Sequence, residues 1–197
     1  MDRTEADGTK RLFVAVPLPV GLHPLVLRAQ EALPRSGGLR VTKPEQWHVT
    51  LAFIGEVDGA KAGVARRVVE ALPADAGGEA AIERFLLLPS ASRARVVALE
   101  LSDQQGVFGA LYEAVVGGLE AGGVMQREKR PFRPHLTIAR LREPGQVRPR
   151  YESERAVFAV QSVCLYESQL RREGAVYTVV CRKVFESGGV DMVHTSQ

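Results

Sequence analysis

Two copies of one short pattern carry the residues best suited to chemistry. The tetrapeptide HVTL at positions 48–51 returns 87 residues later as HLTI at positions 135–138, and the two copies hold half of the four histidines. Alternate side chains of a β-strand point to opposite faces, so each copy places an imidazole and a hydroxyl on one face and two aliphatic residues on the other. Two such strands side by side would form a four-residue polar site from His48, Thr50, His135 and Thr137.

A pair of histidines facing one ligand predicts acid-base catalysis on a phosphate ester. The ordinary pKa of histidine, about 6.5, lets it accept and donate protons near neutral pH. One neutral imidazole would take a proton from water, and the other, protonated, would give one to the departing oxygen. Threonine hydroxyls would donate hydrogen bonds to the non-bridging phosphate oxygens. A ribose 2',3'-cyclic phosphate suits this apparatus, because its strained ring needs only an in-line water and a protonated leaving oxygen.

The motifs have two other interpretations. A single His-x-Thr within a strand is typical of an ordinary structural strand, but a second copy with apolar residues at the same positions favours function. A metal site lacks ligands, because no HxxxH, no DxD and no carboxylate cluster lies beside either histidine. His23 and His194 have no reason to converge on the motifs. We therefore expect catalysis without a metal or another cofactor.

Positive charge is concentrated around the second motif. From residue 127 to 150 the chain has seven arginines and one lysine against two glutamates, a net charge of +6 within a chain of net +3. The planar fork of arginine suits phosphate and stacks on bases, which indicates a surface for a phosphorylated or nucleic-acid ligand. The alternative is a solvated face in an arginine-rich composition.

The hydrophobic pattern predicts an α+β fold with antiparallel sheets. The expected strands are 11–17, 39–42, 47–55, 80–88, 94–101, 135–141, 158–166 and 175–184, and the expected helices are 20–33, 59–72 and 103–119, the last capped by Asp103. The repeated motif suggests two antiparallel sheets with flanking helices, forming two lobes related by a pseudo-twofold axis, with the active-site cleft between them. We expect one bilobal domain over residues 11–186, with disordered tails at 1–10 and 187–197.

Composition places the chain in the ordinary globular class, with 45% hydrophobic and 25% charged residues. No apolar run approaches the roughly 20 residues of a membrane span, and the N-terminus lacks an apolar signal core. A cytoplasmic monomer without membrane contact is expected. Cys164 and Cys181 lack CxxC spacing, so both are expected to be buried thiols.

At these residues the sequence resembles the 2H phosphoesterase superfamily, and within it the bacterial and archaeal RNA 2',3'-cyclic phosphodiesterases, often labelled 2'-5' RNA ligases. The resemblance covers four stretches in order: RLFVAVPLP, KPEQWHVTLAFIGEV, RPFRPHLTIARLR and VYTVVCRKVF. It implies a bilobal α+β fold, with RNA or nucleotides bearing 2',3'-cyclic phosphate ends as partners. The implied reaction is metal-independent hydrolysis to a 2'-phosphomonoester.

The resemblance also implies roles for individual residues. His48 and His135 would be the general acid and base, in an order that the sequence does not fix, and Thr50 and Thr137 would hold the phosphate. The residues five positions after the histidines, Phe53 and Arg140, resemble a base-stacking aromatic and a phosphate-contacting arginine.

Strict strand alternation places Phe53 and Arg140 on the face opposite the histidines, unless a bulge or a strand end turns them back. Arg130 and Arg133 precede His135 and would lie at the mouth of the cleft. Two alternatives to hydrolysis stay open: 2'-5' joining of RNA ends by the same site, and a non-catalytic RNA-binding module that uses the basic window.

Overall fold

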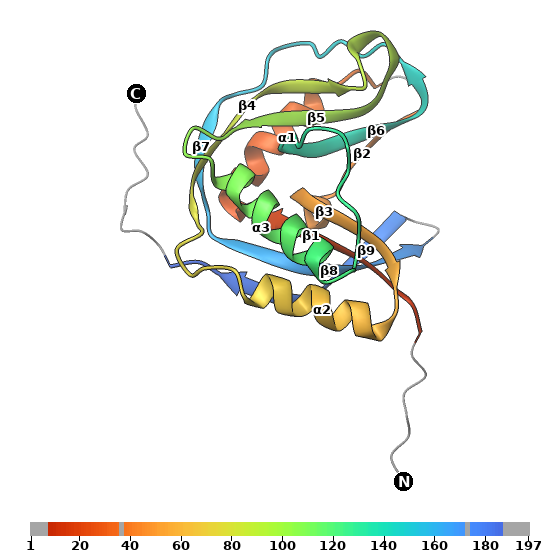
Figure 1. Cartoon of the computed structure of the whole chain (residues 1–197). Helices are drawn as coiled ribbons and strands as arrows, with labels where there is room; N and C mark the ends of the chain where they lie inside the picture. The colour runs from red at the N-terminus through yellow and green to blue at the C-terminus, as the bar shows by residue number, and fades with distance from the viewer. Residues whose placement is uncertain (1–7, 36–37, 172–173, 187–197) are drawn as a thin grey trace.

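The structure is a computed structural model that describes residues 8–35, 38–171 and 174–186. Within these ranges the chain forms nine strands and three α-helices (Figure 1). The strands are β1 (Lys10–Pro17), β2 (Leu39–Val41), β3 (His48–Val57), β4 (Gly78–Leu88), β5 (Ala94–Ser102), β6 (His135–Gly145), β7 (Ala156–Val160), β8 (Ser162–Arg171) and β9 (Gly174–Val184). The helices are α1 (His23–Glu31), α2 (Gly59–Glu70) and α3 (Val107–Ala121).

The strands form two matching halves that meet at the motif strands. All pairings are antiparallel, and the order is β7-β4-β5-β6-β3-β1-β8-β9, with β2 added to β6. Outward from the centre, β3-β1-β8-β9 on one side corresponds to β6-β5-β4-β7 on the other. Only the pair Val49 and Leu136 joins β3 to β6. The predicted antiparallel α+β fold is confirmed, and its two expected sheets are the halves of one hydrogen-bonded array.

The helices cover the apolar sides of the halves. Helix α2 lies along β8 and β9 (Figure 1), while α3 packs on β3 and α1 on β6. Asp58 begins α2 by accepting a hydrogen bond from the Lys61 amide at 2.8 Å, which satisfies a free N–H of the first turn. Phe108 and Leu111 of α3 are almost fully buried. The hydrophobic core therefore supports both motif strands from behind.

One predicted strand was wrong in extent. The run 158–166 was expected as a single strand, but it is divided between β7, which pairs with β4, and β8, which pairs with β1. Gln161 lies between the two strands, where the chain passes from one half to the other. The run is apolar except for Gln161 and Ser162 at the crossing, and it has no Gly or Pro that would mark a turn there.

Two predicted helices begin later than expected. The expected helix at 20–33 opens as a 3-10 turn at Val20–Leu22, and α1 follows with Pro24 in its first turn, where a missing N–H costs nothing. Helix α3 begins at Val107 rather than at Asp103. The Asp103 carboxylate nevertheless accepts hydrogen bonds from the amides of Val107 and Gly109, so it still serves the helix start.

The remaining sequence expectations concern the termini, the cysteines and membranes. Most of the two predicted tails lies outside the described residues, although Lys10 is already part of β1.

Cys164 is buried as expected, but Cys181 is only partly buried, on the opposite face of the β8–β9 pair. In the part of the chain that the structure describes, the helices are too short or too polar to cross a membrane.

Candidate active site

The four motif side chains converge where the two halves meet. Val49 and Leu136 are buried at the single pairing of β3 with β6, and in each strand the histidine and threonine flank this buried residue. Both histidines and both threonines are partly exposed. Since alternate residues of a strand share a face, these polar groups lie on the side away from the helices. This side, carrying His48, Thr50, His135 and Thr137, is called the motif face below.

A bulge follows each threonine and changes which residues share the motif face. Thr50 and Ala52 oppose successive residues of β1, which leaves Leu51 as the extra residue. Ile138 is likewise the extra residue between Thr137 and Ala139 on β6. Both strands consequently have the same exposure pattern over six residues, with two consecutive buried residues after the threonine.

The bulges bring Phe53 and Arg140 onto the motif face. Phe53 pairs with Phe13, whose ring contacts the ring of His48. Arg140 opposes Val96 on β5, two residues before the Ala98 that opposes Thr137, and so shares the threonine's face. Strict alternation from the sequence was wrong for both residues, because a bulge reverses the parity of the strand beyond it. Phe53 is 48% exposed, and the guanidinium of Arg11 lies 4.9 Å from its ring centroid.

His48 lies in an aromatic environment that keeps its imidazole uncharged. Its ring centroid is 4.9 Å from that of Phe13, 5.4 Å from Tyr177 and 6.1 Å from Tyr166. Burial lowers the pKa of His48 from its ordinary value near 6.5 to about 4, and the positive charges of Arg140 and His135 act in the same direction. A backbone hydrogen bond to Gln46 opposes this shift without reversing it. The ligand-free site therefore holds a neutral His48 at pH 7.

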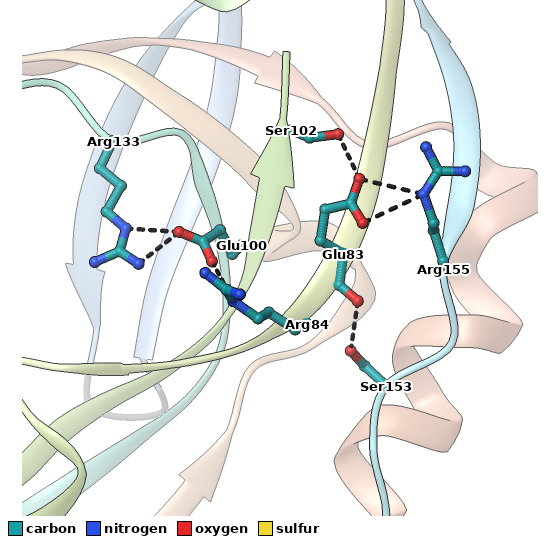
Figure 2. Close-up of polar contacts among 7 residues, drawn as sticks. All are labelled: Glu83, Arg84, Glu100, Ser102, Arg133, Ser153 and Arg155. Carbon is teal, nitrogen blue, oxygen red and sulfur yellow. Dashed lines mark hydrogen bonds and ion pairs between the residues drawn. The ribbon is translucent and has the colours of Figure 1, made fainter. Parts of the chain in front are cut away.

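His135 lies beside a partly buried carboxylate, Glu100, which binds two arginines. Its Nδ1 is 2.8 Å from the carbonyl oxygen of Arg133, and Glu100 of β5 is its direct cross-strand partner. Figure 2 shows Glu100 between Arg133 and Arg84, accepting a hydrogen bond from Arg133 Nε at 2.9 Å and one from Arg84 Nε at 2.7 Å. Burial acts to raise the pKa of Glu100, but the hydrogen bonds from the arginines outweigh it and hold this pKa below its ordinary value.

The arginines predicted before His135 occupy different places. The guanidinium of Arg133 is paired with Glu100, whereas Arg130 is exposed in the connection between α3 and β6. Sequence reasoning missed Glu100 and Gln46. Glu100 had a usable signal, because a lone acidic residue in the apolar run VVALEL needs a partner when it is buried. Gln46 had no such signal in the sequence, because its anchoring depends on a hydrogen bond from its side chain to Ala175 in the distant strand β9.

The described residues contain no group of three or more His, Cys, Asp and Glu side chains close enough together to hold a metal ion. On the motif face two imidazoles, two hydroxyls and Arg140 can act chemically, and the Glu100 carboxylate, directly opposite His135, lies on the same face. Together the imidazoles, the hydroxyls and Arg140 can move protons and donate hydrogen bonds to an anion.

Comparison with known proteins extends this picture. The family model described as LigT like Phosphoesterase matches residues 16–98 and 111–177. The chain is similar to the RNA 2',3'-cyclic phosphodiesterase of Thermus thermophilus, with 30% identity over 86% of this chain and 87% of the relative. It is also similar to the RNA 2',3'-cyclic phosphodiesterase of Archaeoglobus fulgidus, with 28% identity over 89% and 99%. The crystal structure of TT0787 from Thermus thermophilus superposes with a TM-score of 0.75 and 25% identity, covering 89% of this chain and 97% of that one.

Proposed function

Because the chain belongs to the LigT-like phosphoesterase family, we propose that it hydrolyses 2',3'-cyclic phosphate ends of RNA or nucleotides to 2'-phosphomonoesters. The observation that carries this proposal is the convergence of two His-x-Thr pairs on one face, at the pairing of Val49 in β3 with Leu136 in β6. The names of the relatives, RNA 2',3'-cyclic phosphodiesterases that the chain matches over most of its length, support the same reaction.

The proposed mechanism uses the two imidazoles on opposite sides of the phosphorus. A neutral imidazole accepts a proton from water as the water oxygen forms its bond to phosphorus. The bond between phosphorus and the ribose 3' oxygen breaks, and the second, protonated imidazole donates its proton to that oxygen. Thr50 and Thr137 donate hydrogen bonds to the non-bridging oxygens, which gain negative charge in the transition state. The product keeps its phosphate on the 2' oxygen.

Phe53 and Arg140 complete the proposed substrate site. The exposed ring of Phe53 offers a stacking surface for a base, and Arg140 adds a positive charge to the face that holds the phosphate. We propose that Arg130 contacts RNA that extends beyond the site, and its exposure in the connection that leads into β6 supports this.

Turnover of a 2',3'-cyclic nucleotide in excess EDTA tests the proposal. Wild type should convert the substrate to the 2'-phosphate, identified by phosphorus NMR, and His48→Ala and His135→Ala should each lose at least about 10²-fold in kcat/KM. No turnover, or wild-type rates in both variants, would refute hydrolysis. Salt-sensitive RNA binding without turnover would favour the RNA-binding module instead. RNA halves with 2',3'-cyclic and 5'-hydroxyl ends, incubated in parallel, report 2'-5' joining.

A substrate with sulfur in place of the 3' oxygen assigns the two histidines. A thiolate leaves without protonation, so this substrate rescues the variant that lacks the acid and does not rescue the variant that lacks the base. The neutral state of ligand-free His48 does not fix its role by itself, because a bound anionic phosphate raises the pKa of a neighbouring imidazole.

A further inference from the structure

The orientation of His135 depends on one backbone carbonyl. The Nδ1 of His135 is 2.8 Å from the carbonyl oxygen of Arg133. A carbonyl can only accept, so this contact makes Nδ1 the protonated nitrogen of the neutral ring. The Nε2 lone pair is then left for a reacting group. Any movement of the Arg133 backbone would turn the ring or let its proton move to the other nitrogen.

Arg133 is held in place by a carboxylate that the proposed reaction does not otherwise use. Glu100 is directly opposite His135 on β5, and its side chain is 17% exposed. It binds Arg133 through both Nε and Nη2, and Arg84 binds its other oxygen (Figure 2). The neighbouring backbone reinforces this contact, because the Leu101 amide donates to the carbonyl of Pro134 at 3.2 Å. Two consecutive residues before His135 are thus fixed to β5.

The other half of the molecule repeats this arrangement with different residues. Gln46 stands two positions before His48, as Arg133 does before His135, and its backbone also forms a hydrogen bond with the histidine. The Gln46 side chain donates to the carbonyl of Ala175 in β9 at 3.0 Å and accepts from the Lys43 amide at 3.1 Å. In both halves, therefore, the residue whose backbone binds the imidazole is anchored by its side chain, in one half to β5 and in the other to β9.

We propose that Glu100 is a positioning residue for His135, which it fixes through the side chain and carbonyl of Arg133. The effect on turnover rests on the proposed function, whereas the effect on the imidazole does not. Glu100 touches no reacting atom; it keeps Nε2 of His135 directed at the phosphate. The role of Arg133 follows from the same contacts: its guanidinium is bound to Glu100, and its carbonyl serves the histidine.

Kinetics of Glu100→Ala provide the first test, with Glu83→Ala as the matched control. Glu83 lies in the same sheet half, and its carboxylate binds Arg155 and Ser102 without contacting the segment before His135 (Figure 2). Glu100→Ala should lower kcat by about tenfold to hundredfold with KM changed less than about threefold, because the ring is misplaced while the substrate contacts remain. Glu83→Ala should keep the wild-type kcat. Equal kcat in wild type and Glu100→Ala, or equal losses in both variants, would overturn the proposal.

The nitrogen-15 NMR shifts of the His135 ring, recorded at a pH high enough that they no longer change with pH, provide a test that needs no turnover. Wild type should show protonated Nδ1, and Glu100→Ala should show a mixture of the two tautomers. An unchanged tautomer in Glu100→Ala would overturn the proposal even if activity falls. If wild type proves inactive on cyclic phosphates while the tautomer still shifts, the proposed function fails and the positioning role stands.

A double variant tests whether Glu100 acts through Arg133. Arg133→Ala alone should lower kcat to a similar extent, and Glu100→Ala combined with Arg133→Ala should lower it little further, because both changes release the same segment. Multiplying losses in the double variant would mean that the two side chains act independently, and would contradict the proposed connection.

Discussion

Acidification should destabilise this protein because folding lowers the pKa of His48. The substitution His48→Gln should remove this part of the pH dependence. The folded-state pKa of His48 is about 4, against about 6.5 in an unfolded chain. Below pH 6.5 the unfolded chain therefore binds a proton that the folded protein does not, so stability is lost as the pH falls through this window and the loss levels off near pH 4. Between pH 7 and pH 5 this linkage amounts to about 2 kcal/mol.

Urea unfolding of wild type and His48→Gln at pH 7, 6 and 5, in buffers free of phosphate, measures this term. Wild type should lose about 2 kcal/mol more than the variant between pH 7 and pH 5, equivalent to about 4–8 °C in the thermal midpoint. His135→Gln keeps His48 and its aromatic neighbours, and should retain most of the wild-type pH dependence. If wild type and His48→Gln lose stability in parallel, the imidazole is not held neutral by burial.

Three further changes test the phosphate contacts, the base contact and the helix packing. Thr50→Val or Thr137→Val removes a hydroxyl at constant shape and should lower kcat/KM by about 10²-fold to 10³-fold, with an unchanged thermal midpoint; full activity would exclude a phosphate contact. Phe53→Ala should raise KM for cyclic nucleotides about tenfold by removing a stacking surface, with kcat little changed; an unaltered KM would argue against stacking. Gly118→Ala would place a methyl 2.9 Å from Val68 Cγ1, where α3 meets α2, and should cost about 1–3 kcal/mol in urea unfolding. Adding Val68→Ala should recover part of that cost, and no recovery would mean that the clash lies elsewhere.

Much of the fold could be predicted because its elements have clear local signals. The expected hairpin of β4 and β5 has two strand-like runs joined by residues 89–93. The expected first and last residues of both strands agree with the observed ones within two residues. Three sequence signals indicate helix α2: Asp58 before its first residue, apolar residues at helical spacing, and Pro73 after its end. The division between β7 and β8 could not be predicted, because it is set by which distant strand each segment pairs with.

The site divides in a similar way between local and non-local information. The histidines and threonines follow from a repeated pattern within each strand. The placing of Phe53 and Arg140 depends on bulges, although the sequence has a trace of them: Leu51-Ala52 and Ile138-Ala139 are consecutive apolar pairs that break the alternation. Glu100 is brought opposite His135 by the register of β5 on β6, and a register between distant strands has no signature in either strand alone.

The two halves share a scaffold but give their histidines different surroundings, and we expect this difference to couple proton binding to anion binding. His48 is enclosed by aromatic rings and faces the positive charge of Arg140, so protonating it is costly in the ligand-free state. A bound phosphate would make protonation of His48 less costly, because it supplies a negative charge opposite Arg140 and accepts a hydrogen bond from the imidazole. Linkage then requires that protonation of His48 tighten phosphate binding by the same factor by which phosphate favours protonation. A single partly buried imidazole would thereby make the charge of the site depend on whether an anion is bound.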